Sequence, residues 1–293
     1  MKRVIGRKSY KRLVFIVLLF SLMASFITGC SSKDVEASQA KNRLEAILER
    51  GYIEVVMEPY FAPFEFIDPS RDGGEQIVGA DVELAKYIAE KLGVELRLVP
   101  LEFSAVLSSI TEGKYDLAIS ALSYTPARAE AMNMSKGYYF AENNPGYGLL
   151  IREEDKDIIK GPADLVDRVI VAQSGSLQEL FVLEQVPAYK EFKRVSATTD
   201  GFLMVQEGKA DVAAVSKSMA QLYVDANPAA GLMVVEEFEF VVDKSTQGTR
   251  IGIPKGEDEL TERINEIIDE VLERGIYEDW YREYTEYAKT LGL

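Results

Sequence analysis

Two short stretches share one pattern: GKYDLAIS at 113–120 and GKADVAAVS at 208–216. Each begins with Gly-Lys, passes through an aspartate into an apolar run and ends on a serine. The glycine is typical of a helix end, and the apolar run predicts a buried strand. Open α/β sheets bind ligands at the carboxyl ends of their strands. The repeated pattern therefore predicts two α/β units whose strand ends meet at one cleft.

The first copy continues through ALSYTPAR at 121–128, and its polar residues indicate a binding role. A strand that only filled a core would end in a turn, whereas this one ends in Ser120, Ser123 and Arg128. Hydroxyl groups and a guanidinium are the donors that hold a carboxylate, and a guanidinium presents two parallel N–H groups to both oxygens. Arg128 is therefore the leading candidate for an anion-binding residue.

Helical and strand periods alternate on both sides of these stretches. Asp81 is expected to cap a helix that ends at Gly93, and Ser176 is expected to cap one that begins at Leu177. The other expected elements are strands at 52–57, 94–101 and 168–173, a helix at 104–111, a hairpin turn within 68–75 and a long helix through 260–271. This order predicts parallel sheets covered by helices.

The N-terminus has the order of a secretory signal. Six basic residues precede an apolar stretch at 13–27, which leads to Ile-Thr-Gly-Cys at 27–30. The apolar stretch is too short and too rich in serine for a membrane-spanning helix, so residues 1–29 are predicted to be a cleaved signal peptide. Cys30 is the only cysteine and cannot form an intramolecular disulfide. The polar residues after it, 30–42, are expected to be a flexible tether.

The composition excludes several classes of function. The chain of 293 residues carries a formal net charge of −15 and contains no histidine. An acidic chain without a basic aromatic stripe is not expected to bind nucleic acid. Without histidine there is no Ser-His or Cys-His pair, and zinc sites and cofactors are not expected. Any catalysis would depend on carboxylates, Lys, Tyr or Arg.

Six blocks in order resemble the extracytoplasmic solute-binding proteins of ABC importers, in particular the polar amino-acid binding family (family 3). The blocks are PYFAPFEF at 59–66, IVGADVELAKYIAEKLG at 77–93, the segment 113–128, VAQSGSLQE at 171–179, the segment 208–216 and GTRIGIPKG at 248–256. They cover the chain from about residue 44 to 280. The stretch ITGC is similar to a lipoprotein lipobox, which implies an acylated Cys30 and a lipid anchor outside the cytoplasm.

The resemblance implies a two-lobed, type II periplasmic-binding-protein fold with two crossing hinge strands. Lobe 1 would comprise 43–140 plus 246–293, and lobe 2 would comprise 141–245. The implied function is capture of an amino acid or a related carboxylate-bearing solute between the lobes. The lobes would close on the solute, and the protein would deliver it, as a monomer, to a membrane permease without performing catalysis.

The resemblance also implies roles for residues of the anion-binding end. Arg128 would hold the α-carboxylate of the solute, and Ser123 would add its hydroxyl and N–H groups. From the opposite lobe, the capped helix start at Ser176 would offer backbone N–H groups to the same anion. Leu177 stands where family members usually have a hydroxyl residue, so only its amide can serve.

The remaining implied residues would surround the rest of the solute. Phe61 would cover the solute side chain, with Phe64 as a second aromatic candidate. Glu58 matches a position that is often acidic in members that take basic ligands and would bind a cationic group. Ser120 would offer its carbonyl to a cation.

Ser216 departs from the family pattern, because amino-acid binders usually carry an aspartate there for the α-ammonium. Either Glu58 or Glu142 replaces that aspartate, or the solute is not a simple α-amino acid, since an unpaired ammonium in a dry cleft is costly. Two alternative functions stay open. One is an enzyme similar to the cyclohexadienyl dehydratases, with Glu58 or Glu142 as general acid. The other is a ligand-sensing subunit of a membrane receptor.

Overall fold

The structure is a computed structural model that describes residues 42–140, 146–244 and 247–293. The predicted signal peptide, Cys30, almost all of the tether and Glu142 lie outside these ranges. Within them, no helix combines the length and apolar character needed to cross a membrane.

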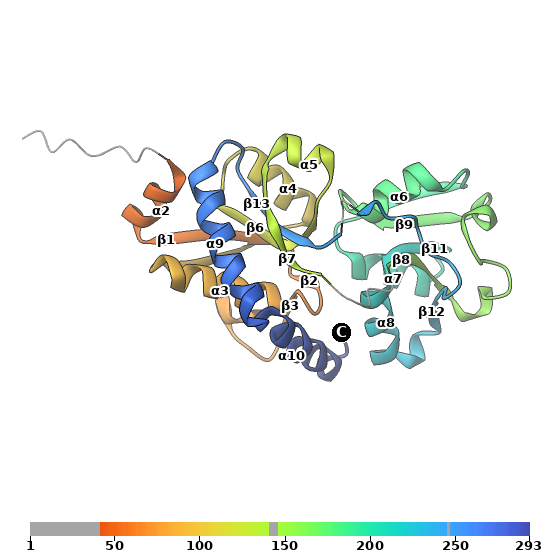
Figure 1. Cartoon of the computed structure of the whole chain (residues 1–293). Helices are drawn as coiled ribbons and strands as arrows, with labels where there is room; N and C mark the ends of the chain where they lie inside the picture. The colour runs from red at the N-terminus through yellow and green to blue at the C-terminus, as the bar shows by residue number, and fades with distance from the viewer. Residues whose placement is uncertain (1–41, 141–145, 245–246) are drawn as a thin grey trace, which may run out of the picture. The chain divides into compact units, whose positions relative to one another are not determined.

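The first of two five-stranded sheets contains strands from both ends of the described chain (Figure 1). Strand β1 pairs in parallel with β5 and β6, whereas β13 is antiparallel to both β6 and β7. The predicted parallel pairing is confirmed for β1, β5 and β6, whereas the sequence analysis made no prediction for β13, which enters the sheet only after the chain has built the second one. The strand order is β5 (Glu95–Pro100), β1 (Tyr52–Met57), β6 (Leu117–Ser123), β13 (Thr249–Ile253) and β7 (Asn133–Tyr139).

Helices cover this sheet and close its core. The apolar faces of α3 and α9 pack on the strands through residues such as Ile88, Ile264 and Ile268, all fully buried. The expected long helix is confirmed as α9, and its regular apolar spacing explains why it was predictable. The helices on this side are α2 (Arg43–Arg50), α3 (Ala80–Leu92), α4 (Phe103–Thr111), α5 (Pro126–Ala131), α9 (Asp258–Arg274) and α10 (Ile276–Leu291).

The second sheet has the same number of strands and its own core. Strand β9 pairs in parallel with β10 and β11, while β8 is antiparallel to β11 and β12. The order is β10 (Glu191–Val195), β9 (Val169–Gln173), β11 (Val212–Ser216), β8 (Tyr147–Arg152) and β12 (Leu232–Val234). Its helices are α6 (Leu177–Gln185), α7 (Thr198–Gln206) and α8 (Lys217–Ala226), with short 3-10 turns at Glu153–Asp155, Pro162–Leu165 and Pro228–Ala230.

A small third sheet connects β1 to α3. It consists of β2 (Tyr60–Phe61), β3 (Glu65–Ile67) and β4 (Ile77–Val78), all antiparallel, with a 3-10 turn at Gly73–Gln76. The hairpin predicted within 68–75 is confirmed as the connection from β3 to β4.

The predicted helix caps are right at Ser176 and wrong at Asp81. The Ser176 hydroxyl accepts from the backbone N–H of Glu179 at 3.1 Å, as an N-cap does. Helix α3 instead begins after Gly79, which has φ of 137°. Gly79 lies so close to Phe64 that a Cβ added to the glycine would be 2.1 Å from the carbonyl oxygen of Phe64. Asp81 is thereby placed inside the first turn, where it is fully buried.

We call the parts of the chain built on the first and second sheets lobe 1 and lobe 2. The chain passes between the two sheets twice, once through residues 141–145 and once through residues 245–246. Both segments lie outside the described residues, so the predicted lobe boundaries stay a prediction. The lobes touch where α8 meets α10: the Asn227 side chain donates to the Gly292 carbonyl at 2.9 Å, and Leu222 packs in one cluster with Ala288.

Candidate functional site

A cavity of about 670 Å³ is lined by residues of both lobes. The structure brings together all eight residues that the sequence placed in a solute site: Glu58, Phe61, Ser120, Ser123, Arg128, Ser176, Leu177 and Ser216. Phe64 lines the same cavity. The contributions come from strand ends and a helix start, as the repeated sequence pattern predicts.

Strand β6 has an unusual backbone conformation where it lines the cavity. Ala121 has φ of 46°, the only described non-glycine residue in the left-handed region, and its N–H donates to the Asp81 carboxylate at 2.8 Å. A strained residue of this kind persists only when the surrounding structure holds it. Ser120 in the middle of β6 and Ser123 at its end both line the cavity, on either side of Ala121.

The Arg128 guanidinium is held by neutral groups. It donates to the carbonyl oxygens of Ser123, at 2.8 Å, and Gly175, at 3.0 Å, so it links lobe 1 to lobe 2. Among the described residues, no carboxylate lies within ion-pair distance of it. Burial lowers the pKa of Arg128 to about 10, which still leaves it charged at neutral pH. A guanidinium has five N–H donors, so it retains capacity for an anion.

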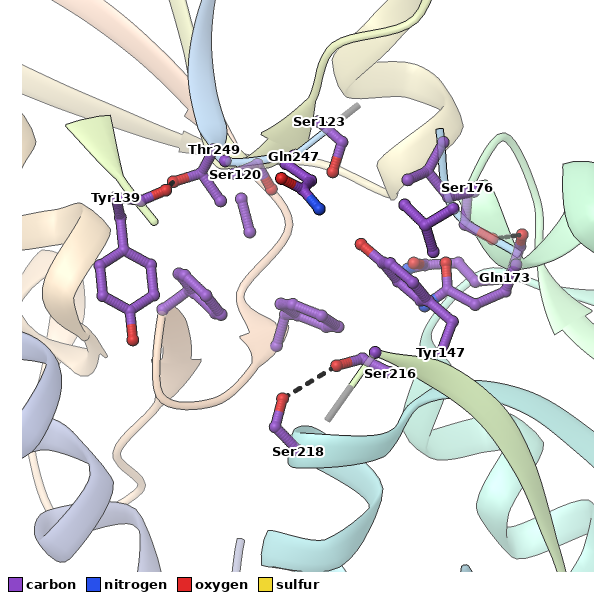
Figure 2. Close-up of a pocket in the computed structure, with 18 of the residues that line it drawn as sticks. Ser120, Ser123, Tyr139, Tyr147, Gln173, Ser176, Ser216, Ser218, Gln247 and Thr249 are labelled. Carbon is purple, nitrogen blue, oxygen red and sulfur yellow. Dashed lines mark hydrogen bonds between the residues drawn. The ribbon is translucent and has the colours of Figure 1, made fainter. Parts of the chain in front are cut away.

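The start of α6 faces Arg128 from lobe 2. The backbone N–H groups of Leu177 and Gln178 belong to the first helical turn, where no intrahelical acceptor exists. Ser176 itself is occupied, since its hydroxyl also donates to the Gln173 carbonyl at 2.7 Å. Figure 2 shows Ser123 of lobe 1 opposite Gln173 and Ser176 of lobe 2.

Tyr147 is a cavity residue that the sequence reasoning missed. It begins β8, is paired in register with Ser216, and lies near the hydroxyl of Ser123 and the charge of Arg128. Burial raises its pKa, and those two neighbours oppose the rise. The only sequence signal was an aromatic residue at the start of a strand after the crossing, which is too common to be decisive.

Glu58 is only 2 % exposed and lies beside Ser120, whereas Arg128 contacts Ser123, three residues further along β6. Burial raises the pKa of Glu58 to about 8, a hydrogen bond from Gln173 opposes the rise, and the charge of Asp200 adds to it. Its backbone N–H donates to the Ser120 hydroxyl at 3.0 Å, while its Oε1 has no hydrogen-bond partner among the described residues. Glu58 is therefore a buried acid that lacks a cation.

Two more buried acids adjoin Glu58, and the sequence reasoning assigned neither to the site. Glu65 is fully buried, lines the cavity and accepts from the Ser120 hydroxyl at 2.7 Å. Asp81, expected to be a helix cap, instead accepts hydrogen bonds from Tyr138 at 2.9 Å and Tyr277 at 2.5 Å. Burial raises the pKa of both carboxyls, and their mutual repulsion raises that of Glu65 further.

Aromatic rings form the apolar wall of the cavity. Phe61 and Phe64 stack with centroids 5.6 Å apart, and Phe64 meets the edges of Tyr139 and Tyr281. Phe61 also packs against the core of lobe 2, so it contacts both lobes. The structure places both candidate phenylalanines at the cavity; their contact with a solute stays a prediction.

Ser216 lies beside a second hydroxyl rather than an acid. Its Oγ is 3.0 Å from that of Ser218 (Figure 2). Glu142, one of the two acids considered as a substitute, lies outside the described residues. The cavity thus has a cationic end at Arg128 and an acidic end at Glu58 and Glu65, joined by hydroxyl groups and covered by aromatic rings. This arrangement can hold a zwitterionic or cationic small molecule with its carboxylate at Arg128.

Comparison with protein families gives one match over most of the chain. The family described as "Bacterial extracellular solute-binding proteins, family 3" matches residues 53–287. A curated relative is the arginine-binding extracellular protein ArtP of Bacillus subtilis (strain 168), 25% identical over 266 residues, which cover 89% of this chain and 93% of that protein.

Solved structures of amino-acid-binding proteins also match this chain. An amino acid ABC transporter substrate-binding protein from Streptococcus pneumoniae bound to L-arginine matches with a TM-score of 0.74 and 28% identity, over 83% of this chain and 97% of that one. An ancestral amino-acid-binding protein, a precursor of cyclohexadienyl dehydratase, matches with a TM-score of 0.69 and 26% identity, over 83% and 99%.

Proposed function

The chain belongs to the bacterial extracellular solute-binding proteins of family 3, and from this membership we propose that it captures a basic amino acid for an ABC importer. L-arginine is the foremost candidate. The solute lies between the lobes with its α-carboxylate on Arg128 and its side-chain cation at Glu58. Closure of the lobes around it produces the form that docks on the membrane permease.

One observation carries the proposal: Arg128 is a guanidinium in a cavity wall with only neutral partners. A partly buried charge without a counter-ion is unfavourable, and a ligand carboxylate would supply the missing charge. Its Nη2 already donates across the lobes to Gly175, so an anion bound there would contact both lobes at once. Binding shared in this way links ligand capture to closure.

The choice of a basic solute has two supports. Glu58 is a buried acid without a cation, and it lines the cavity beside Ser120. In addition, ArtP is named as arginine-binding and the Streptococcus pneumoniae protein was solved with L-arginine. The serine at 216 means that the α-ammonium must rely on hydroxyl groups and on acids elsewhere in the cavity.

The same proposal includes location outside the cytoplasm, with acylated Cys30 as the anchor. The order of basic, apolar and small residues before Cys30 supports it. Replacement Cys30→Ser in the full chain should move the protein from the membrane fraction to the soluble extracytoplasmic fraction. An unchanged membrane fraction would contradict the anchor without affecting the solute site.

Isothermal titration of the form beginning at Ser31 with L-arginine, L-histidine, L-glutamine and L-glutamate tests the solute class. We expect the tightest binding for L-arginine, at micromolar Kd or below, and none for L-glutamate. Binding of L-glutamate in preference to both basic amino acids would overturn the proposal.

A second candidate function is favoured by Glu58. A carboxyl whose pKa is about 8 is mostly protonated at neutral pH, as a general acid must be. The ancestral precursor of cyclohexadienyl dehydratase has the same fold. Incubation with prephenate or arogenate, followed by absorbance of the aromatic product, decides: product formation that Glu58→Gln abolishes would establish the enzyme.

A further inference from the structure

The Glu65 carboxyl lies within electrostatic range of two other buried carboxyls, those of Glu58 and Asp81. The Ser120 hydroxyl accepts from the backbone N–H of Glu58 at 3.0 Å and donates to Glu65 Oε1 at 2.7 Å. The carboxyl group of Asp81 lies close to that of Glu65, and the two negative charges would repel each other. No basic residue among those described contributes to the environment of any of the three.

Asp81 is built to hold a negative charge. Its two oxygens accept from the hydroxyls of Tyr138 and Tyr277 and from the N–H of Ala121. Donors in this number stabilise the ionised form of a carboxylate. The charge of the group therefore resides on Asp81, and it makes ionisation of the adjacent Glu65 more costly.

Glu58 and Glu65 have donors too, but each is left with one oxygen that has none within the described ranges. Glu58 Oε1 and Glu65 Oε2 are buried and have no hydrogen-bond partner among the described residues. The groups facing Glu58 are Gln173, Asp200 and the Tyr60 amide. Those facing Glu65 are the Ser120 hydroxyl, Glu58 and Asp81, and the protonated Glu65 carboxyl can donate to Asp81. A buried ionised oxygen without a donor is costly, so each of these carboxyls needs either a proton or a cation. Both line the cavity, where a solute can bring the cation.

We propose that Glu65 is a specificity-determining residue that forms, together with Glu58, a two-carboxyl receptor for one cationic group of the solute. The inference rests on the proposed function. A guanidinium or ammonium enters in exchange for a proton: one carboxyl O–H bond ionises, the proton passes to the solvent, and the cation takes its place. The Ser120 hydroxyl holds the Glu65 carboxyl and the backbone of Glu58 for this exchange, and Asp81 keeps Glu65 neutral until the cation arrives.

The test compares L-arginine with L-citrulline, which replaces the guanidinium by a neutral ureido group of nearly the same shape. The variant Glu65→Gln resembles the protonated acid, since its amide oxygen can still accept from Ser120. We expect Glu65→Gln to lower the arginine-to-citrulline affinity ratio by about 10-fold or more, with citrulline affinity changed by less than about threefold. If the ratio is unchanged, Glu65 is only structural and the inference fails.

Two controls make the result specific. Glu75→Gln removes an exposed negative charge on the same connection and should leave the ratio unchanged. Proton release by the unmodified protein needs no variant: titrations in buffers of different ionisation enthalpy should show about one more proton released with arginine than with citrulline. Equal proton release would overturn the inference, whereas failure of the unmodified protein to bind arginine would overturn the proposed function instead.

Discussion

The two ends of the cavity hold charge in opposite ways. At one end, Arg128 keeps its charge and is surrounded by backbone carbonyls from both lobes. At the other, Glu58 and Glu65 lie close to a third acid, and burial favours their neutral forms. The Arg128 guanidinium is a cation at any physiological pH and therefore always attracts an anion. The carboxyls of Glu58 and Glu65 become anionic only when a bound cation or a higher pH favours their ionisation.

This difference assigns separate tasks to the two ends. An always-charged guanidinium gives affinity for every solute with a carboxylate. A pair of acids that must lose a proton contributes only when the solute brings a positive charge, so it discriminates between solutes of similar shape. Under the proposed function, affinity would therefore depend mainly on Arg128, and selectivity would depend mainly on Glu58 and Glu65.

The largest expected effect concerns the cationic end. Arg128→Ala should weaken L-arginine binding on the order of 1000-fold, because a desolvated carboxylate loses its counter-ion. Arg128→Lys should retain the charge but lose the paired N–H geometry, with a loss of about 10- to 100-fold. Titration calorimetry measures both, and affinity within threefold of the unmodified protein would remove Arg128 from the site.

The acidic end predicts a pH effect on the unliganded protein. The pKa of Glu58 is raised from 4.5 to about 8, so its contribution to stability is present below 4.5 and is lost as pH rises through 8. Glu65 acts in the same direction. The free energy of unfolding should fall by on the order of 3 kcal/mol between pH 5 and 8.

Glu58→Gln is the matching control, since the amide does not ionise. Its unfolding free energy, measured by urea denaturation at several pH values, should fall less steeply over the same range. Saturating L-arginine should also make the unfolding free energy of the unmodified protein fall less steeply with pH. Identical slopes in variant and unmodified protein would show that Glu58 does not titrate as described.

A smaller effect is expected where the lobes approach each other. Gly175 has φ of +77°, and a Cβ there would lie 3.2 Å from Leu107 of lobe 1. Gly208 has a similar φ of +71° but no atom within 4 Å of a Cβ. Gly175→Ala should therefore weaken arginine binding by about 10-fold, while Gly208→Ala costs about 1 kcal/mol of stability without changing affinity. Equal arginine affinities of Gly175→Ala and the unmodified protein would mean that the close approach of Gly175 to Leu107 plays no part in closure.

The smallest change is expected at Ser216. Ser216→Asp would place an acid at the position where the family usually has one, next to Ser218. We expect a gain of about fivefold in affinity for L-arginine and none for 5-guanidinopentanoate, which keeps the carboxylate and the guanidinium but has no α-ammonium. A loss of arginine affinity would indicate that the α-ammonium binds elsewhere in the cavity.

Local sequence pattern predicted the parts of the site that depend on local structure. Ser176 caps its helix and Ser120 ends its apolar run, because both positions follow from spacing alone. The antiparallel edge of the first sheet was not predictable in this way, since the direction of β13 depends on where the chain returns from lobe 2.

The acidic end illustrates what the sequence could not show. Asp81 precedes an apolar helical run and so resembles an N-cap, but the close contact of Gly79 with Phe64 starts the helix earlier and buries the carboxylate. Its partners Tyr138 and Tyr277 lie far away in the chain. Glu65 becomes a candidate only when Ser120, from another strand, donates to it.

The most direct test of the two-ended site is the melting temperature of the form beginning at Ser31 with three ligands of similar size: L-arginine, agmatine and L-citrulline. Agmatine lacks the carboxylate for Arg128, and citrulline lacks the cation for Glu58 and Glu65. At about 1000 times a micromolar Kd, L-arginine should raise the melting temperature by roughly 8 to 16 °C, and each analogue should raise it by less than about half as much. A shift with agmatine or citrulline equal to that with arginine would contradict the account.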